Sequence, residues 1–354
     1  MHPIYAGLNS DHSISHRDFL TIVNDIQAAY AQGKTNIMFD CFSEAFWNSV
    51  ISRIQSIVKY VKDSVPNAQF FFLTGDLKGE EAYNTFLEMN NEEPLLKIVS
   101  MSYFEAMFKS SYGIHTPQEY MPGLRDKKFL CFNKVHRQHR IELLEEMFKY
   151  NLVDQAYYSF QGSEPSFIDN IIEYKDNFPY CVQNINRLPL KLNINSYKEN
   201  PVNITQDDWQ YFNNSYFSVV TETMYRYYPD DQIISPGCFF SEKIFKPLAM
   251  KHPFIVVGTS GYLSTLRERG YKTFAPYIDE SYDMITSPKE RMDAIVNEIR
   301  RLCSLSDDEM IQWTHDIKHI VEHNADILKN EFDFTITKDL IKYFTTDNTL
   351  NMSE

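Results

Sequence analysis

The sequence predicts an α/β protein of two doubly wound domains that face a cleft. Apolar runs alternate with amphipathic segments, and residues 111–125 interrupt this pattern with two glycines and two prolines before it starts again. A chain of 354 residues is long enough for two domains that each bury a core. We therefore expect domains at residues 1–125 and 126–325, with a C-terminal helix and tail at 326–354 that is able to cross back onto the first domain.

The first domain is expected to begin with a strand, a helix and a second strand. Residues 36–39 and 69–73 are apolar runs that end near an acidic or turn residue, and an amphipathic segment at 44–62 separates them. A weaker strand at 96–99 and a helix at 103–109 continue the alternation.

The second domain repeats the alternation. The strand 128–132 precedes the helix 136–150 and the short strand 156–160, and a further strand covers 217–221. The Asn- and Pro-rich stretch 176–209 has weak periodicity and is expected to be irregular. Strands that alternate with helices indicate a parallel, Rossmann-like sheet, whose ligands bind beyond the carboxyl ends of the strands.

The segment FFSEKIFKPLAMKHPFIVVG, residues 239–258, predicts an anion site at a helix start. Ser241 is a helix-capping residue, and Lys243 together with the positive end of the helix dipole favours a phosphate. Pro247 is expected to bend this helix into two segments. The apolar run 253–257 is a core strand that Gly258 closes.

The remaining helices are marked by their end signals. A helix over 261–269 stops at Gly270. Two capping boxes are expected to open later helices: Ser287 with Pro288 and Glu290, and Ser306 with Glu309. The last helical region is expected at 307–344.

Composition excludes several classes of protein. Hydrophobic residues at 43% argue against disorder, and the formal net charge of −14 argues against non-specific binding to nucleic acid or anionic membranes. No segment has the pattern of a signal peptide or a membrane span. The widely spaced cysteines support neither a zinc site nor a disulfide framework, so we expect reduced thiols, no metal site and a cytoplasmic protein. These cysteines are Cys41, Cys131, Cys181, Cys238 and Cys303.

A basic cluster at residues 125–140 runs against the acidic charge of the whole chain. The strand 128–132 would deliver Asn133, Lys134 and Arg137 to its carboxyl end, where the next helix begins and where a diphosphate would be held. Arg140 lies within that helix and is a further candidate. The alternative is a solvated helix face on which the basic side chains pair with glutamates at i,i+4 spacing.

Two further acids are candidates for the same ligand. Glu222 ends the strand that precedes the capped helix, and Glu280 belongs to the acidic run at 279–283, spaced to bind sugar hydroxyls. The alternative for Glu222 is an ordinary strand-end acid, and for Glu280 a solvated turn. No GxxxxGK[ST], GxGxxG after a strand, GxSxG or HExxH motif is present, so ATPase, dehydrogenase, esterase and zinc-protease mechanisms lack their usual motifs.

The order KFLCFNKVHRQHRIELLEEMF, YFSVVTET, FFSEKIFKPLAMKHPFIVVG, LRERGYKTF and DESYD resembles the donor-binding half of exostosin-like and fucosyltransferase-like glycosyltransferases, including viral and bacterial forms. The resemblance covers residues 128–300 and implies the GT-B architecture, in which the C-terminal domain binds a nucleotide sugar. This chain has Ser241 where fucosyltransferases commonly have threonine, and it lacks their membrane anchor. Residues 1–125 resemble no family that we can name.

The resemblance also implies roles for single residues. Lys243 would bind the donor diphosphate, Glu242 the ribose or sugar, and Arg140 the same diphosphate, while Glu222 would lie near the donor. The donor would be linked to UDP or GDP, with no bound cofactor. Fixed cations are able to replace a metal in stabilising the leaving group.

An inverting mechanism needs a base from the first domain, and a retaining mechanism does not. Asp40 and Asp76 each follow an apolar strand and are the best placed candidates, with Asp11 and His12 behind them. The common alternative for a strand-end aspartate is a turn or cap.

The leading hypothesis is a metal-independent glycosyltransferase that moves a sugar from a nucleoside-diphosphate donor to a hydroxyl acceptor such as a glycan. A viral origin would place it in the host cytoplasm and would allow a phage-type DNA glycosyltransferase acting on a hydroxymethylated base. A further hypothesis is a non-catalytic nucleotide-sugar or glycan-binding protein. A structural interaction module is disfavoured by the dense donor-side pattern. The oligomeric state is left open.

Overall fold

The structure is a computed structural model that describes residues 2–4, 16–41, 48–110, 119–161, 166–192, 206–225 and 237–329. These residues form two compact units: unit 1, residues 2–103 and 237–239, and unit 2, residues 104–225 and 240–329. The division falls between residues 103 and 104. The sequence places the boundary later, in the stretch 111–125. Residues 111–118 lie outside the described part of the chain.

Unit 1 also contains residues from the middle of the predicted second domain. The carboxylate of Asp76 accepts a hydrogen bond from the backbone N–H of Cys238 at 2.9 Å, and the N–H of Leu77 donates to the Cys238 carbonyl, also at 2.9 Å. Backbone pairing of this kind joins segments far apart in the chain, so periodicity along the sequence cannot reveal it.

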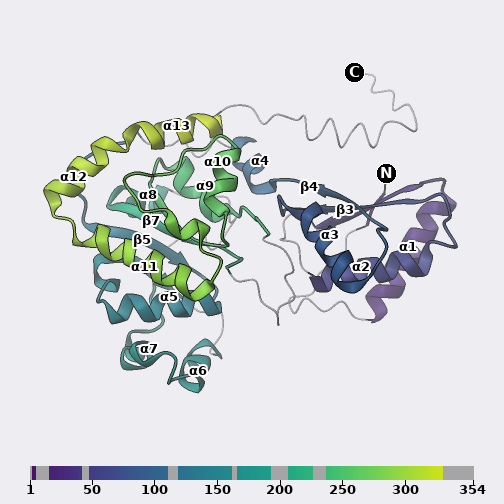
Figure 1. Ribbon diagram of the computed structural model, residues 1–354, viewed down its shortest axis with the longest axis horizontal. Helices are drawn as coiled ribbons and strands as arrows, with labels where there is room; N and C mark the ends of the chain where they lie inside the picture. Colours follow the sequence, from purple (N-terminus) through teal and green to yellow (C-terminus); the bar gives the residue numbers. More distant parts are fainter. Residues whose placement is uncertain are drawn as a thin grey trace. The chain divides into compact units, whose positions relative to one another are not determined.

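The sheet of unit 1 has four parallel strands whose spatial order, β1-β2-β3-β4, follows the chain. Crossover connections between parallel strands are right-handed, so connections that all lead to the next strand on the same side put their helices on one face of the sheet. Figure 1 shows α1, α2 and α3 on the same side of β3 and β4. In its described residues, unit 1 is therefore singly wound, in contrast to the doubly wound sheet that the sequence predicts. The strands are β1 (His2–Ile4), β2 (Asn36–Cys41), β3 (Gln69–Thr74) and β4 (Lys97–Ser100), and the helices are α1 (His16–Ala31), α2 (Asn48–Val61) and α3 (Gly79–Asn90).

Burial along the strands explains how the core of unit 1 forms. In β2, half-buried and buried residues alternate, whereas β3 is buried from its second residue on. The buried Ile37 and Phe39 join Phe72 of β3 in a core that α1 and α2 cover with Ile26 and Ile54. All five side chains are at most 1% exposed. The apolar faces of the strands and of the two helices therefore pack into one core.

The sheet of unit 2 is also parallel, but its order is β6-β5-β7-β8. The chain leaves β5 toward β6 on one side and then returns past β5 to form β7 and β8 on the other side. Helices α5 and α11 pack against each other on one face, and α8 and α9 pack against β7. This sheet is doubly wound, as predicted.

The helices and strands of unit 2 match most of the predicted ones within two or three residues. They are α4 (Tyr103–Ser110), β5 (Lys127–Asn133), α5 (Gln138–Lys149), η1 (Val153–Gln155), β6 (Ala156–Phe160), α6 (Ser166–Glu173), α7 (Pro179–Gln183), η2 (Ile185–Arg187), α8 (Gln206–Asn213), β7 (Ser215–Thr221), α9 (Glu242–Ala249), β8 (Phe254–Val257), α10 (Tyr262–Glu268), η4 (Ser281–Met284), α11 (Pro288–Ser304), α12 (Asp307–Asp316) and α13 (Lys318–Lys329).

Three local predictions need correction. The described part of the stretch 176–209, expected to be a loop with an irregular strand, contains α7, η2 and the start of α8. Pro179 is compatible with α7 because it occupies the first turn, where a missing N–H costs nothing. Pro247 lies inside α9, yet no second helical segment follows before β8. The region 307–344 begins as two helices, α12 and α13, and its residues after 329 lie outside the described part of the chain.

The predicted helix starts and the stop at Gly270 are confirmed, but only Ser306 forms a complete capping box, with Glu309. Ser287 and Ser306 accept hydrogen bonds from the N–H groups of Glu290 and Glu309, and Gly270 has a φ of +89° beyond α10. Among the described helices, none combines the length and the apolar character that crossing a bilayer requires.

Candidate functional site

The candidate site lies at the carboxyl ends of β5 and β7 in unit 2. These neighbouring strands are the point where the strand order reverses, since the connection after β5 leads to one side and the connection that returns to β7 leads to the other. Such a switch point separates the connecting loops and is where open α/β sheets bind ligands. Asn133 ends β5 and Thr221 ends β7, and the Thr221 hydroxyl donates to Asn133 Oδ1 at 2.5 Å.

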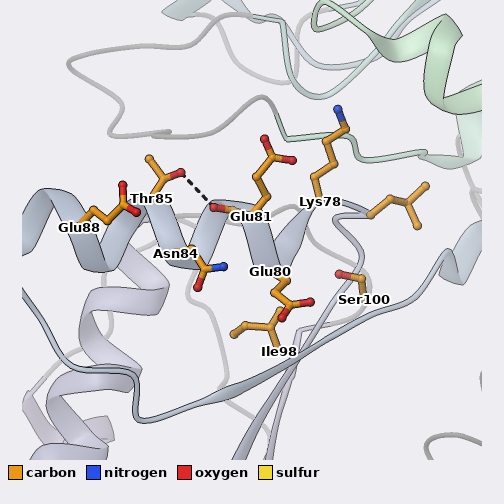
Figure 2. A pocket seen from close by; sticks show the side chains of 9 residues that line it. Lys78, Glu80, Glu81, Asn84, Thr85, Glu88, Ile98 and Ser100 are labelled. Atoms are coloured by element: carbon orange, nitrogen blue, oxygen red, sulfur yellow. Dashed lines mark hydrogen bonds between the residues drawn. The ribbon is translucent and has the colours of Figure 1, made fainter.

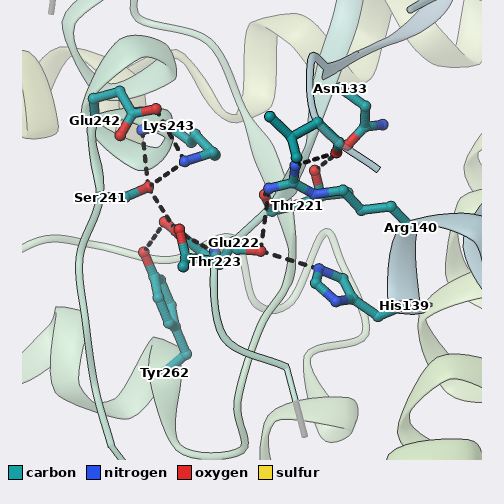
Figure 3. Close-up of polar contacts among 11 residues, drawn as sticks. Asn133, His139, Arg140, Thr221, Glu222, Thr223, Ser241, Glu242, Lys243 and Tyr262 are labelled. Carbon is teal, nitrogen blue, oxygen red and sulfur yellow. Dashed lines mark hydrogen bonds and ion pairs between the residues drawn. The ribbon is translucent and has the colours of Figure 1, made fainter. Parts of the chain in front are cut away.

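The start of α9 lies beside these strand ends (Figure 3). Ser241 caps the helix, with its Oγ accepting from the N–H of Lys243 at 3.3 Å. The Lys243 ammonium donates to Ser241 Oγ at 3.2 Å and to Glu242 Oε1 at 2.9 Å. The Lys243 side chain is 26% exposed and that of Glu242 is 17% exposed. This pair is therefore partly accessible to solvent.

Glu222 connects β7 to both α9 and α10. Its Oε2 accepts from the Ser241 hydroxyl at 2.6 Å, and its Oε1 accepts from the Tyr262 hydroxyl at 2.7 Å. The residue is 1% exposed. A buried carboxylate with two hydroxyl donors is a fixed acceptor, so Glu222 orients Ser241 and, through it, the Lys243 ammonium.

Arg140 is buried, with 3% exposure, and its guanidinium is directed to backbone carbonyls. Nη1 donates to the Val135 carbonyl at 2.7 Å, and Nη2 donates to the Thr221 carbonyl at 3.1 Å. His139 Nε2 donates to the Glu222 carbonyl at 3.0 Å. The arginine that the sequence assigns to a diphosphate thus holds the ends of β5 and β7 together.

The other basic candidates differ in exposure. Lys134 is exposed just beyond β5, whereas Arg137 is half-buried at the N-cap position of α5. The first turn of α5 contains no acid, and its N-cap side chain makes no capping hydrogen bond. Asn133 is buried and contacts Thr221 and Cys131. Of this group, only Lys134 and Arg137 combine a positive charge with access to solvent near the switch point.

A second lysine influences the electrostatics of α9. Burial lowers the pKa of Lys246 to about 8, with the neighbouring Lys243 also acting to lower it and the carboxylates of Glu242 and Asp208 acting to raise it. Burial acts to raise the pKa of Glu242, but the charges of Lys243 and Lys246 and its hydrogen bonds outweigh burial, so this pKa lies below its ordinary value. Glu242 therefore stays ionised beside Lys243.

The carboxylate of Glu280 makes local contacts. It accepts from the hydroxyl of Thr273 at 2.7 Å, from the backbone N–H of Phe274 at 2.5 Å and from Arg267 at 3.1 Å. Asp283, in the same acidic run, accepts from the N–H groups of Leu263 and Ser264 at the start of α10. Glu280 and Asp283 thus fix a turn and a helix start, but the Glu280 side chain is only 8% exposed, so this is not the solvated turn of the alternative reading.

Of the four candidate bases, Asp40 and Asp76 lie within the described residues of unit 1. Asp40 is half-buried on β2, and Asp76 is fully buried, with Oδ1 accepting from the N–H groups of Lys78 and Cys238. Asp11 and His12 lie outside the described residues. Asp76 thus has the turn-forming role that is common for strand-end aspartates.

Sequence reasoning missed Tyr262, His139 and Lys246. Tyr262 begins α10, shortly after β8 ends at Val257. The signal available in the sequence was that Tyr262 lies just beyond the carboxyl end of a strand. Lys246 lies four residues after Glu242, on the same face of α9. His139 gave no local signal, because its partner is a carbonyl 83 positions away.

No group of His, Cys, Asp and Glu side chains within the described ranges is arranged to hold a metal ion. Comparison with known protein families, curated proteins and solved structures finds no match for this chain. The chain is an α/β protein with two parallel sheets and a charged cluster at the switch point of the second.

Proposed function

We propose that the chain is a glycosyltransferase whose unit 2 binds the nucleoside diphosphate of a sugar donor, linked to UDP or GDP. The observation that carries this proposal is the partly exposed Lys243 ammonium at the amino end of α9, which contacts Glu242 and Ser241, the latter fixed by Glu222 at the sheet's switch point. A cation beside a helix start attracts phosphate.

The roles of the remaining residues follow from their exposure. Lys134 and Arg137 would supply further positive charge at the amino end of α5, and Glu242 would accept hydrogen bonds from ribose or sugar hydroxyls. Arg140 and Glu222 would act indirectly, as buried residues that keep the strand ends and Ser241 in place. In a transfer reaction the fixed cations would stabilise the leaving diphosphate.

The first experiment is a thermal-shift panel of UDP, GDP, CDP, ADP and dTDP. Selective binding to the native state raises the unfolding temperature by mass action. We expect one diphosphate to stabilise the wild type and the shift to disappear in Lys243→Ala. The matched control is Lys289→Ala, which removes the same charge from an exposed lysine on α11 that is paired with Asp293.

Two results would contradict the proposal. One is the absence of a shift with every diphosphate, and the other is a Lys243→Ala protein that binds the diphosphate as tightly as Lys289→Ala does. A Lys243→Arg variant that restores part of the affinity would show that the charge is what binds.

A non-catalytic nucleotide-sugar-binding protein is the second candidate. It is favoured by the burial of Asp76, whose carboxylate organises backbone in unit 1. Incubating the protein with radiolabelled nucleotide sugar, a glycan panel and hydroxymethylated duplex DNA separates the alternatives. Transfer to a glycan supports the enzyme proposal, transfer that requires DNA supports the phage-type alternative, and binding without turnover supports the second candidate.

A further inference from the structure

A groove on unit 1 is formed by α3 and the last strand of its sheet, β4. It has a volume of about 670 Å³ and is lined by side chains of both elements and of the turn before α3 (Figure 2). β4 pairs with β3 on one side and is the last strand in the described sheet. No strand within the described residues pairs with its other edge, and an edge strand of this kind is able to accept an added strand.

The side of the groove that belongs to α3 is acidic. Glu80, Glu81 and Glu88 line it together with Asn84 and Thr85, and Lys78 is the one lysine among the lining residues. Within the described residues, none of the three glutamates has an ion-pair partner. Figure 2 shows Glu80 and Asn84 pointing to the side of α3 on which Ile98 and Ser100 lie.

The geometry of α3 matches an extended chain. Glu80 and Glu88 are eight residues apart, which corresponds to about 12 Å along a helix. Side chains on one face of a strand repeat about every 6.8 Å, so two such repeats span a similar distance. A strand added to the edge of β4 would place alternate side chains against α3. Basic side chains at those positions would neutralise the glutamates, whereas acidic ones would be repelled.

We infer that this groove is a docking surface for an extended, lysine- or arginine-rich segment of a partner protein, which adds as a strand to β4 and places its basic side chains against the glutamates of α3. This mode combines main-chain hydrogen bonds for affinity with side-chain contacts for specificity. The inference does not depend on the proposed donor site, because all lining residues belong to unit 1.

The test uses fluorescence anisotropy with the full-length protein and a labelled seven-residue peptide that alternates lysine and valine. We expect saturable binding that weakens as salt screens the charges, and no binding of the peptide that alternates glutamate and valine. The variant Glu80→Lys/Glu88→Lys should weaken binding at least tenfold. The matched control, Glu173→Lys/Glu268→Lys, makes the same charge change at exposed helix ends of unit 2 and should bind like the wild type.

Backbone methylation tests the strand pairing separately. In a strand, the N–H groups of alternate residues point to opposite edges. Methylating the amides of either the lysines or the valines should abolish binding, while methylating the other set should leave it intact. The inference is overturned if both methylated peptides bind equally, if spermine binds as tightly as the peptide, or if the two double variants behave alike.

Discussion

In unit 1 the strand order follows the chain from β1 to β4, whereas in unit 2 the chain reverses direction between β5 and β7. Both sheets are parallel, and in both an acid follows a strand that ends in threonine: Asp76 two residues after Thr74, and Glu222 directly after Thr221. Their surroundings differ. Asp76 accepts from backbone N–H groups, while Glu222 accepts from the hydroxyls of Ser241 and Tyr262 beside a charged helix start. In the sheet without a reversal of strand order the acid, Asp76, organises backbone. In the sheet with the reversal the acid, Glu222, organises a candidate binding site.

The largest effect is expected from removing the two acids in turn. Glu222→Leu leaves the buried hydroxyls of Ser241 and Tyr262 without their acceptor and should cost roughly 3–5 kcal/mol. Asp76→Leu leaves two backbone N–H groups without an acceptor and should cost a similar amount. Only Glu222→Leu should also abolish nucleoside diphosphate binding, because only it releases the serine that holds Lys243. Unfolding in urea measures the cost, and thermal shift measures binding.

Glu222→Gln is the control for that comparison, since its amide keeps one acceptor oxygen and should lose less stability. Equal diphosphate binding by Glu222→Leu and Asp76→Leu would remove the functional difference between the two acids.

Lys246→Met tests the buried charge on α9. Helix α3 of unit 1 has no buried charged side chain. The native pKa of Lys246, about 8, lies below the 10.5 of an ordinary lysine, so burial of its charge opposes folding. At pH 7 the variant should be more stable than the wild type by about 3 kcal/mol. As pH rises from about 8 to 10.5 the unfolded wild type binds more protons than the native one, so wild-type stability rises and the difference shrinks.

Urea unfolding of both proteins across this pH range checks the sign. A difference that grows above pH 8 would show that the charged lysine stabilises the fold. Lys243→Met is the matched control, because Lys243 is partly exposed on the same helix.

The smallest effect is expected from two glycines that follow strands in the two sheets. An alanine at Gly79 would place its Cβ 2.6 Å from the buried Thr74 side chain, whereas at Gly258 the nearest atom, in Val256, lies at 3.1 Å. Overpacking should cost roughly 1–2 kcal/mol at Gly79 and under about 1 kcal/mol at Gly258. Hydrogen exchange of the amides of β3 and β8 in the two alanine variants measures the loss of stability in unit 1 and in unit 2 separately. A larger loss at Gly258 would contradict the packing difference.

Periodicity along the chain determined the elements of this protein. Apolar runs place β2, β3, β5 and β7, and the serine caps and Gly270 mark helix ends, because each signal depends on neighbours within a few residues. The same local chemistry placed Ser241 and Lys243 at the start of α9. The predicted nucleotide-sugar donor and the candidate base Asp40 remain predictions.

Only the tertiary structure decided how those elements pair and which charges solvent reaches. The order of strands depends on contacts between segments far apart, so the sequence could not distinguish the single winding of unit 1 from the double winding of unit 2. Arg140 and Lys243 look alike as cations in the sequence, but buried Arg140 donates to the carbonyls of Val135, just after β5, and Thr221, at the end of β7, whereas Lys243 is partly exposed. Local sequence specifies which groups a segment offers, and long-range packing determines which of them are already occupied.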